Sequence, residues 1–103
     1  MNVKVRSIKP TNESNKFLLE MHIGTDWHQF LMTAVADTIA GEKIKVIKGD
    51  KSFCQTFRFN QELGVKLYKM VSEFNRGKRV ELPTEIGDFS ESEIERVSFL
   101  TKA

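Results

Sequence analysis

Apolar and polar residues alternate over two neighbouring segments of the chain, residues 16–23 and 27–36. This period of two is typical of β-strands. Gly24, Thr25 and Asp26 lie between the segments and supply residues that tolerate the backbone angles of a tight turn. We therefore expect an antiparallel hairpin. An even-length turn places the following side chains on one of its faces: Phe17, Leu19, Met21, Ile23, His28, Phe30, Met32 and Ala34.

The opposite face of this hairpin is not purely polar, although a sheet face in contact with water normally is. Four apolar residues interrupt the polar ones there: Leu18, Trp27, Leu31 and Val35. A contiguous exposed apolar patch usually marks an interaction site, so we predict that these four residues form a protein interface. Either a helix at the C-terminal end of the chain or a second chain could cover the patch, and the sequence leaves both possibilities open.

A helix is the alternative interpretation of residues 26–39, because Asp26 could cap it and the segment contains Leu31, Ala34 and Ala36, which favour helices. Four β-branched residues in the segment favour a strand, and so does the continued alternation of apolar residues. We predict a strand. The interface argument depends on this assignment, since a helix would remove the second apolar face.

Further alternating segments flank the hairpin. Residues 3–8 predict a first strand, which the Pro10 region ends. Residues 43–48 and 52–59 alternate around Gly49 and Asp50, which predicts a second hairpin in which Val46 faces Phe53 and Ile44 faces Gln55. One face would carry Ile44, Val46, Phe53, Phe57 and Phe59, and the other would carry Lys43, Lys45, Cys54, Thr56 and Arg58.

The last third of the chain has helical periodicity. Asn60 is a favourable N-cap, apolar residues recur at helical spacing over 63–74, and Gly77 is a typical C-terminal stop. Residues 79–82 predict a short strand. Ser90 and Glu93 have the spacing of a capping box, which predicts a final helix over about residues 91–101.

At 103 residues the chain has the size of one domain, which we place at residues 1–103. Its hydrophobic content of 40% is sufficient for one compact core. Strands that precede helices, without the βαβ alternation of nucleotide-binding sheets, indicate the α+β class. We expect a five-stranded antiparallel meander followed by an amphipathic helix, a short strand and a C-terminal helix.

Charge gives a second hypothesis about function. The formal net charge of +2 is too small to imply a polyanionic partner by itself. However, the predicted outer sheet face carries five cations near Trp27, and single-stranded nucleic acid binders combine positive charge with aromatic rings. Nucleic-acid binding by this face is therefore the alternative hypothesis. Its residues would be Lys4, Arg6, Lys43, Lys45 and Arg58.

Residues capable of catalysis are few. His22 and His28 are the only histidines, and their opposite parity in the predicted hairpin makes the two side chains diverge. They therefore do not suit a shared metal ion. Cys54 is the single cysteine and has no adjacent base in the sequence, whereas a nucleophile requires one. We expect no catalytic residue, no metal site and no bound cofactor.

The chain has no apolar segment long enough to span a membrane, no leader-like segment and no possible intramolecular disulfide, so we expect a cytoplasmic location without membrane attachment. Taken together, these observations predict a small, non-catalytic protein-binding or regulatory module. The mixture of apolar and charged residues on the second sheet face resembles an interface with a polar rim, which favours a homodimer.

Overall fold

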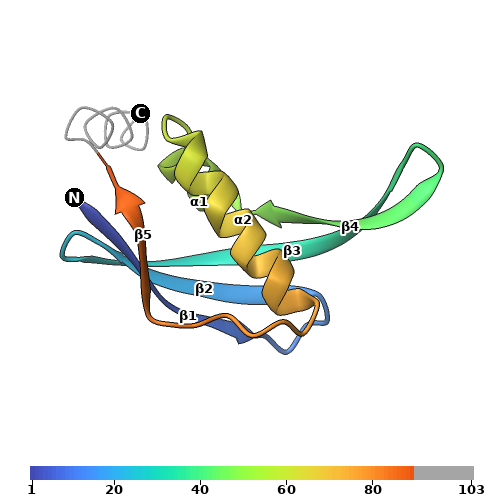
Figure 1. Ribbon diagram of the computed structural model, residues 1–103, viewed down its shortest axis with the longest axis horizontal. Coiled ribbons are helices and arrows are strands. Elements are labelled where there is room, and N and C mark those ends of the chain that lie inside the picture. Colours follow the sequence, from blue (N-terminus) through green and yellow to red (C-terminus); the bar gives the residue numbers. More distant parts are fainter. Residues whose placement is uncertain (90–103) are drawn as a thin grey trace.

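The computed structural model describes residues 1–89, except for the side chain of Ile39. The elements in these residues are β1 (Asn2–Pro10), β2 (Lys16–Ile23), β3 (Asp26–Ile39), β4 (Glu42–Gly49), α1 (Lys51–Thr56), α2 (Gln61–Asn75) and β5 (Thr84–Asp88) (Figure 1). The strands form one antiparallel sheet in the spatial order β4, β3, β2, β1, β5. The chain is therefore α+β, as predicted, with a four-stranded meander followed by helices and a fifth strand.

The hairpin of β2 and β3 has the predicted division of side chains between its two faces. Ile23 pairs with Asp26 across a two-residue turn, and Leu19 pairs with Phe30 farther along. The shared face of the two strands is buried, whereas Trp27 on the other face is 49% exposed. Residues 26–39 form a strand and not a helix. The second sheet face on which the interface argument depends is therefore present.

β3 and β4 form a long hairpin that extends beyond the helices (Figure 1). Ala40 and Gly41 make its two-residue turn, and both have positive φ angles (53° and 81°), as turns between twisted strands require. This turn fixes Val46 opposite Val35 and Ile47 opposite Ala34. Ile47 consequently faces the core. The prediction that Ile44 and Val46 face the core is wrong, because the register differs by one residue and turns both side chains to the other face.

Residues 52–59 do not form a strand, so the predicted hairpin around Gly49 and Asp50 is wrong. Asp50 instead caps α1, because its Oδ1 accepts a hydrogen bond from the Phe53 amide at 2.8 Å. Its Oδ2 also accepts from the Leu31 amide at 3.0 Å, which ties the helix start to β3. Phe53 and Phe57, four residues apart, then point into the core from one side of α1.

α2 confirms the predicted helix and both of its ends. The Asn60 side chain accepts from the Leu63 amide, as an N-cap does. At the other end Gly77 has φ 78°, and the amides of Gly77 and Lys78 donate to the carbonyls of Phe74 and Glu73. These two bonds are those of a Schellman motif, which ends the helix at this point.

β5 lies after Pro83 and not at the predicted residues 79–82, which form no strand. Thr84 pairs with Val5 and Asp88 pairs with Asn2, so β5 adds to the free side of β1. The pairing of β1 with β5 continues at Met1 and Phe89. The Met1 amino group donates to the Phe89 carbonyl at 2.7 Å, and the Phe89 amide donates to the Met1 carbonyl at 2.8 Å. The predicted capping box and helix over about residues 91–101 lie outside the described residues.

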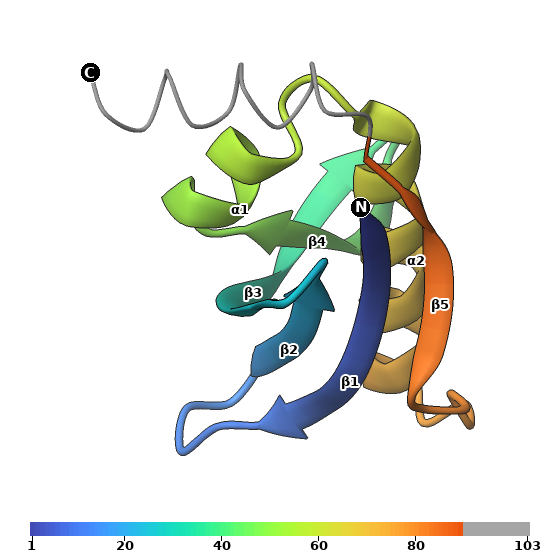
Figure 2. The same cartoon turned by 90° about the vertical axis from the view of Figure 1, so that its left-hand side faces the viewer.

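The sheet curls around one side of the helices like half of a barrel (Figure 2). The core lies between its concave face and the helices, and rings from β3 and α1 meet there. Phe30 contacts Phe53 and Phe57 edge to face, at centroid distances of 5.5 and 5.8 Å. Leu67 and Val71 of α2 are fully buried against the same face. The convex face carries neither helix.

Candidate interaction surfaces

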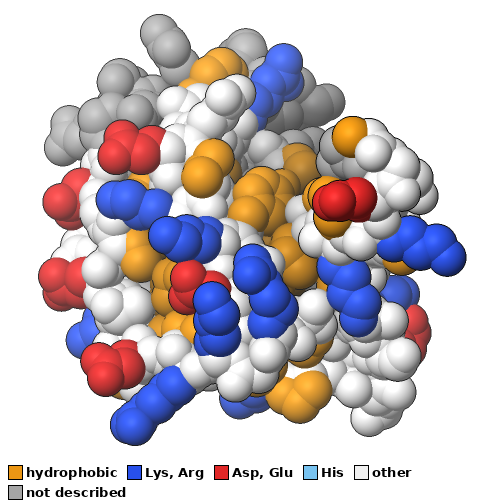
Figure 3. All heavy atoms as spheres, turned by 45° about the vertical axis from the view of Figure 1, so that its right-hand side comes forward, with side chains coloured by type: hydrophobic (Ala, Val, Ile, Leu, Met, Phe, Trp, Pro, Cys, Tyr) orange, Lys and Arg blue, Asp and Glu red, His pale blue; other side chains and the backbone are white. Residues whose placement is uncertain are grey.

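A hollow lies between α2 and the outer edge of β4. It has a volume of about 580 Å³ and is lined by Val46, Ile47, Val65, Tyr68, Lys69 and Ser72. Figure 3 shows hydrophobic side chains on its floor, and Lys and Arg side chains together with some acidic ones around it. Val65 is 64% exposed, which is unusual for an apolar residue in the middle of an amphipathic helix.

A second hollow of about 410 Å³ continues the first between α1 and α2 and shares Val65 and Tyr68 with it. Arg58 is its charged lining residue. Burial raises the pKa of the Tyr68 phenol, whose polar neighbours are the Gly49 backbone and the Cys54 thiol. Together the two hollows form a groove that follows α2, with Arg58 at one end and Lys69 at the other. None of the residues that line it is acidic.

The outer edge of β4 borders this groove and has no neighbouring strand among the described residues. The Asp50 amide donates to the Leu31 carbonyl of β3. Asp50 is therefore a position whose main-chain groups point towards β3. Because bonded pairs alternate along an antiparallel ladder, the backbone groups of Lys43, Lys45 and Ile47 point away from β3 towards the open side. No pattern in the sequence predicts this groove, because it depends on how α2 packs against β4.

The convex face carries two apolar pairs, one on β2 and β3 and one on β3 and β4, which together we call the apolar strip. Leu18 is paired with Leu31, and Val35 is paired with Val46. All four side chains are partly exposed, and neither described helix covers them. Ile44, which is 38% exposed, extends the strip along β4. Leu18 and Leu31 are thus neighbours, whereas Val35 lies farther along β3, beyond Thr33. The structure adds Val46 beside Val35, which the incorrect parity of β4 had assigned to the core.

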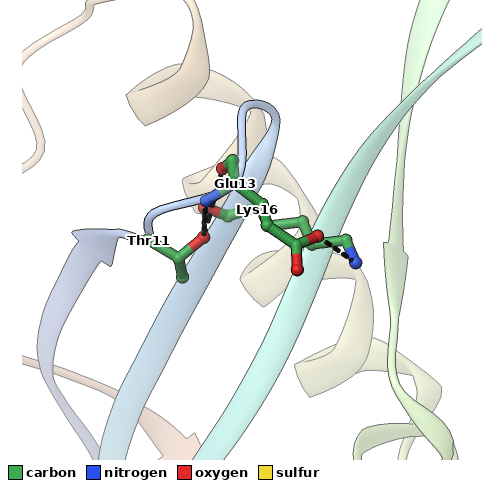
Figure 4. Close-up of polar contacts among 3 residues, drawn as sticks. All are labelled: Thr11, Glu13 and Lys16. Atoms are coloured by element: carbon green, nitrogen blue, oxygen red, sulfur yellow. Dashed lines mark hydrogen bonds and ion pairs between the residues drawn. The ribbon is translucent and has the colours of Figure 1, made fainter.

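Lys16 lies opposite Thr33, and Lys48 lies on the other side of Thr33, so this row separates the two apolar pairs of the strip. The loop before β2 holds Lys16 in place (Figure 4). Thr11 Oγ1 donates to the Lys16 carbonyl at 3.0 Å and accepts from the Glu13 amide at 3.2 Å. Glu13 then forms an ion pair with the Lys16 ammonium group at 2.6 Å. The strip therefore has a rim that contains both positive and negative charge.

Trp27, the fourth predicted interface residue, lies near the other end of the convex face. It pairs with His22, and the two rings meet edge to face at 5.0 Å. The Arg6 Nε donates to the His22 Nδ1 at 3.2 Å, and Lys4 lies opposite His22. Trp27 is therefore surrounded by polar and basic groups and is separated from the apolar strip.

The five predicted nucleic-acid-binding residues do not share one face. Lys4 and Arg6 lie near Trp27, as predicted. Lys43 and Lys45 have the same parity as the core residue Ile47, which places them on the concave side of the β3–β4 hairpin. Arg58 follows α1 because residues 51–56 are a helix. The correction of β4 and α1 therefore divides the predicted basic surface into three separate places.

Glu20 separates the apolar strip from Trp27 on the convex face. It is only 5% exposed, although it lies on the outer side of the sheet. Lys9 Nζ, Ser7 Oγ and Gln29 Nε2 all donate to its carboxylate, at 2.9, 2.7 and 2.8 Å. These bonds, that from Lys9 foremost, lower the pKa of Glu20 from its usual 4.5 to about 2.

We predict that the stability of the protein depends on this carboxylate at acidic pH. A lowered pKa in the folded state favours folding above pH 4.5, and the contribution is lost as the pH falls towards 2. With Lys9 largely exposed, the contribution is on the order of 2 kcal/mol. Denaturant unfolding of wild type and Glu20→Gln should differ by that amount at pH 7 and by much less at pH 3. An equal difference at both pH values contradicts this account.

The residues considered for catalysis are dispersed. His28 is half-buried on the concave side, where burial lowers its pKa, and its ring stacks on Phe30 at 5.8 Å. His22 lies on the convex side, so the two imidazoles diverge as predicted. Cys54 is exposed on α1. Within residues 1–89 no group of three or more His, Cys, Asp or Glu residues is placed to hold a metal ion.

No described helix is both long enough and apolar enough to cross a membrane. Comparison with known proteins identifies no relative: no family model, no curated protein and no solved structure matches the chain.

Proposed function

We propose that the protein is a small non-catalytic binding module that acts through protein contacts, and that it forms a homodimer through the apolar strip of Leu18, Leu31, Val35 and Val46. The observation that carries this proposal is the two apolar pairs of the strip, Leu18–Leu31 and Val35–Val46, which lie on either side of the Lys16–Thr33–Lys48 row on a sheet face that neither described helix covers. Apolar patches of this kind usually mark interaction sites.

A second copy of the chain is the partner that the rim of the strip favours. Lys16 and Glu13 beside it, and Asp37 opposite Ile44 at its far end, supply charges of both signs. In a two-fold interface the same patch meets itself, so a rim of mixed sign can satisfy its own charges. The net charge of +2 is small enough for two copies to approach without strong repulsion.

The double variant Val35→Thr/Val46→Thr tests the proposal. Threonine keeps the shape and the strand preference of valine but places a hydroxyl in the interface, where burial without a partner is unfavourable. We expect wild type to show a dimer in sedimentation equilibrium, and the dissociation constant of the variant to rise about tenfold or more, because each change occurs twice in a symmetric dimer.

The matched control is Val65→Thr, the same chemical change at an exposed position on α2. It should leave the dissociation constant unchanged. Circular dichroism shows whether each variant keeps its fold. A wild-type protein that remains monomeric at millimolar concentration, or a double variant that associates as wild type does, excludes the strip as a dimer interface.

A further inference from the structure

We propose that the groove between α2 and the free edge of β4 binds an extended, acidic segment of a partner protein, which adds to the sheet as a strand beside β4. This site lies on the α2 side of β4, whereas the proposed dimer interface lies on the convex face, and Val46 borders both. None of the other strip residues lines the groove.

The backbone of β4 supplies the pairing groups for such a strand. Lys43, Lys45 and Ile47 direct their amides and carbonyls to the open side, as the bond from the Asp50 amide to Leu31 establishes. Within the described part of the chain no hydrogen bond to these outward groups is present. Strand addition to a free sheet edge uses groups of this kind for affinity.

The wall of the groove supplies contacts for side chains of the bound segment. Successive residues of a strand point to opposite faces, so every second side chain of the added strand would face α2. Val65, Tyr68 and Ile47 offer apolar surface there. An edge strand alone is a weak binding site, whereas an edge beside an apolar helix face also selects the side chains that it binds.

Charge identifies the class of partner. The charged groups that line the groove are Arg58 and Lys69, and β4 adds Lys43, Lys45 and Lys48 against one acidic residue, Glu42. Pairing of β4 with β4 of a second copy would bring the lysines of both strands together, and edge lysines normally prevent such pairing. In an added strand, acidic side chains on the concave side would face Lys43, Lys45 and Lys69, and those on the convex side would face Lys48. The charges therefore favour an acidic partner over a second copy.

The direct test uses the full chain and a blocked heptapeptide in which Glu and Val alternate. A control peptide carries Pro in place of the central Val, which keeps the charge but cannot pair as a strand. A second control carries Lys in place of each Glu. Isothermal titration calorimetry should detect binding of the Glu–Val peptide, about tenfold or more weaker binding of the Pro peptide, and no binding of the Lys peptide.

A charge reversal in the protein locates the site. Lys69→Glu should weaken binding of the Glu–Val peptide about tenfold or more, since it places a like charge in the groove. Lys78→Glu makes the same change in the exposed loop after α2 and should leave the affinity within about twofold of wild type. Equal affinities of the two variants overturn the proposal, as does equal affinity of wild type for the Glu–Val and Pro peptides.

Hydrogen exchange distinguishes strand addition from other occupants of the edge. Saturating Glu–Val peptide should slow exchange at the amides of Lys43, Lys45 and Ile47, while Ile44 and Val46 are already protected by β3. The proposal is wrong if these three amides are protected in the free protein, because another segment or a second copy then covers the edge. It is also wrong if the peptide leaves their exchange unchanged.

Discussion

Replacing Phe30 with alanine is expected to lower the free energy of unfolding by about 3–5 kcal/mol, a large part of the stability of a domain of this size. Phe30 is 1% exposed and contacts the rings of Phe53 and Phe57, so its removal leaves a cavity between the sheet and α1. Because this ring joins the two layers, neighbouring side chains can fill the space only in part. Chemical denaturation followed by circular dichroism measures the loss.

Phe59→Ala is the matched control for this change. Phe59 is 38% exposed and lies after α1, so its truncation should cost less than about 1 kcal/mol. A loss at Phe30 no greater than that at Phe59 would show that the aromatic cluster does not hold α1 against the sheet.

The second large effect is expected at Asp50, where alanine should lower the free energy of unfolding by about 2–3 kcal/mol. The two carboxylate oxygens of Asp50 accept from different elements, one from the Phe53 amide of α1 and the other from the Leu31 amide of β3. Alanine removes the helix cap and also leaves the Leu31 amide without its acceptor. The same denaturation experiment measures this loss.

Asp50→Asn separates the two roles of the carboxylate, since an amide side chain has one acceptor oxygen and not two. Asp50→Asn should lower the free energy of unfolding relative to wild type, but by less than Asp50→Ala does. Asp37→Ala is the control, because Asp37 is exposed on the β3–β4 hairpin and, among residues 1–89, its side chain accepts only from the adjacent Thr38 amide. Equal losses for the alanine variants of Asp50 and Asp37 contradict the proposed link between α1 and β3.

Local signals in the sequence were sufficient for β2, β3 and α2. The alternation of Phe17 to Ile23 and of Phe30 to Ala34 predicted both strands and the division of their side chains between the two faces, because a one-residue shift would turn every apolar side chain to the other face. Asn60 and Gly77 predicted the ends of α2, since caps depend on residues next to them in the chain.

The segment around Gly49 and Asp50 was misread because two local signals compete there. Glycine followed by aspartate between alternating segments favours a hairpin, but aspartate is also a preferred N-cap. Phe53 and Phe57 fit both a strand and one side of a helix. The bond from Leu31 to Asp50 and the close packing of Phe53 on Gly49, where a Cβ atom would lie 2.6 Å from the Phe53 Cγ, favour the helix. Neither contact is visible in the sequence.

β5 illustrates the same limit at longer range. Val80 and Leu82 predicted a strand from their alternation, yet the strand begins at Thr84, where the chain reaches the free side of β1. Its position depends on pairing with residues about eighty positions earlier, and local pattern contains no such information. The groove beside β4 was not predictable for the same reason, since it requires the packing of α2 against that strand.

The apolar strip could be predicted in part. Leu18, Leu31 and Val35 followed from the parity of the central hairpin, and Trp27 shares their face but lies among His22, Arg6 and Lys4. Val46 was missed because the turn at Ala40 and Gly41, and not the one assumed at Gly49, determines the register of β4.

The most direct test of the proposed function is a concentration series of methyl ¹H–¹³C spectra of the wild-type protein. The account predicts that, from about 10 μM to 1 mM, methyl signals of Leu18, Leu31, Val35 and Val46 shift together as the dimer forms, while those of Val65 remain in place. Methyl chemical shifts of these four residues that stay constant over this range, or shifts that change at Val65 instead, would contradict the proposed dimer interface.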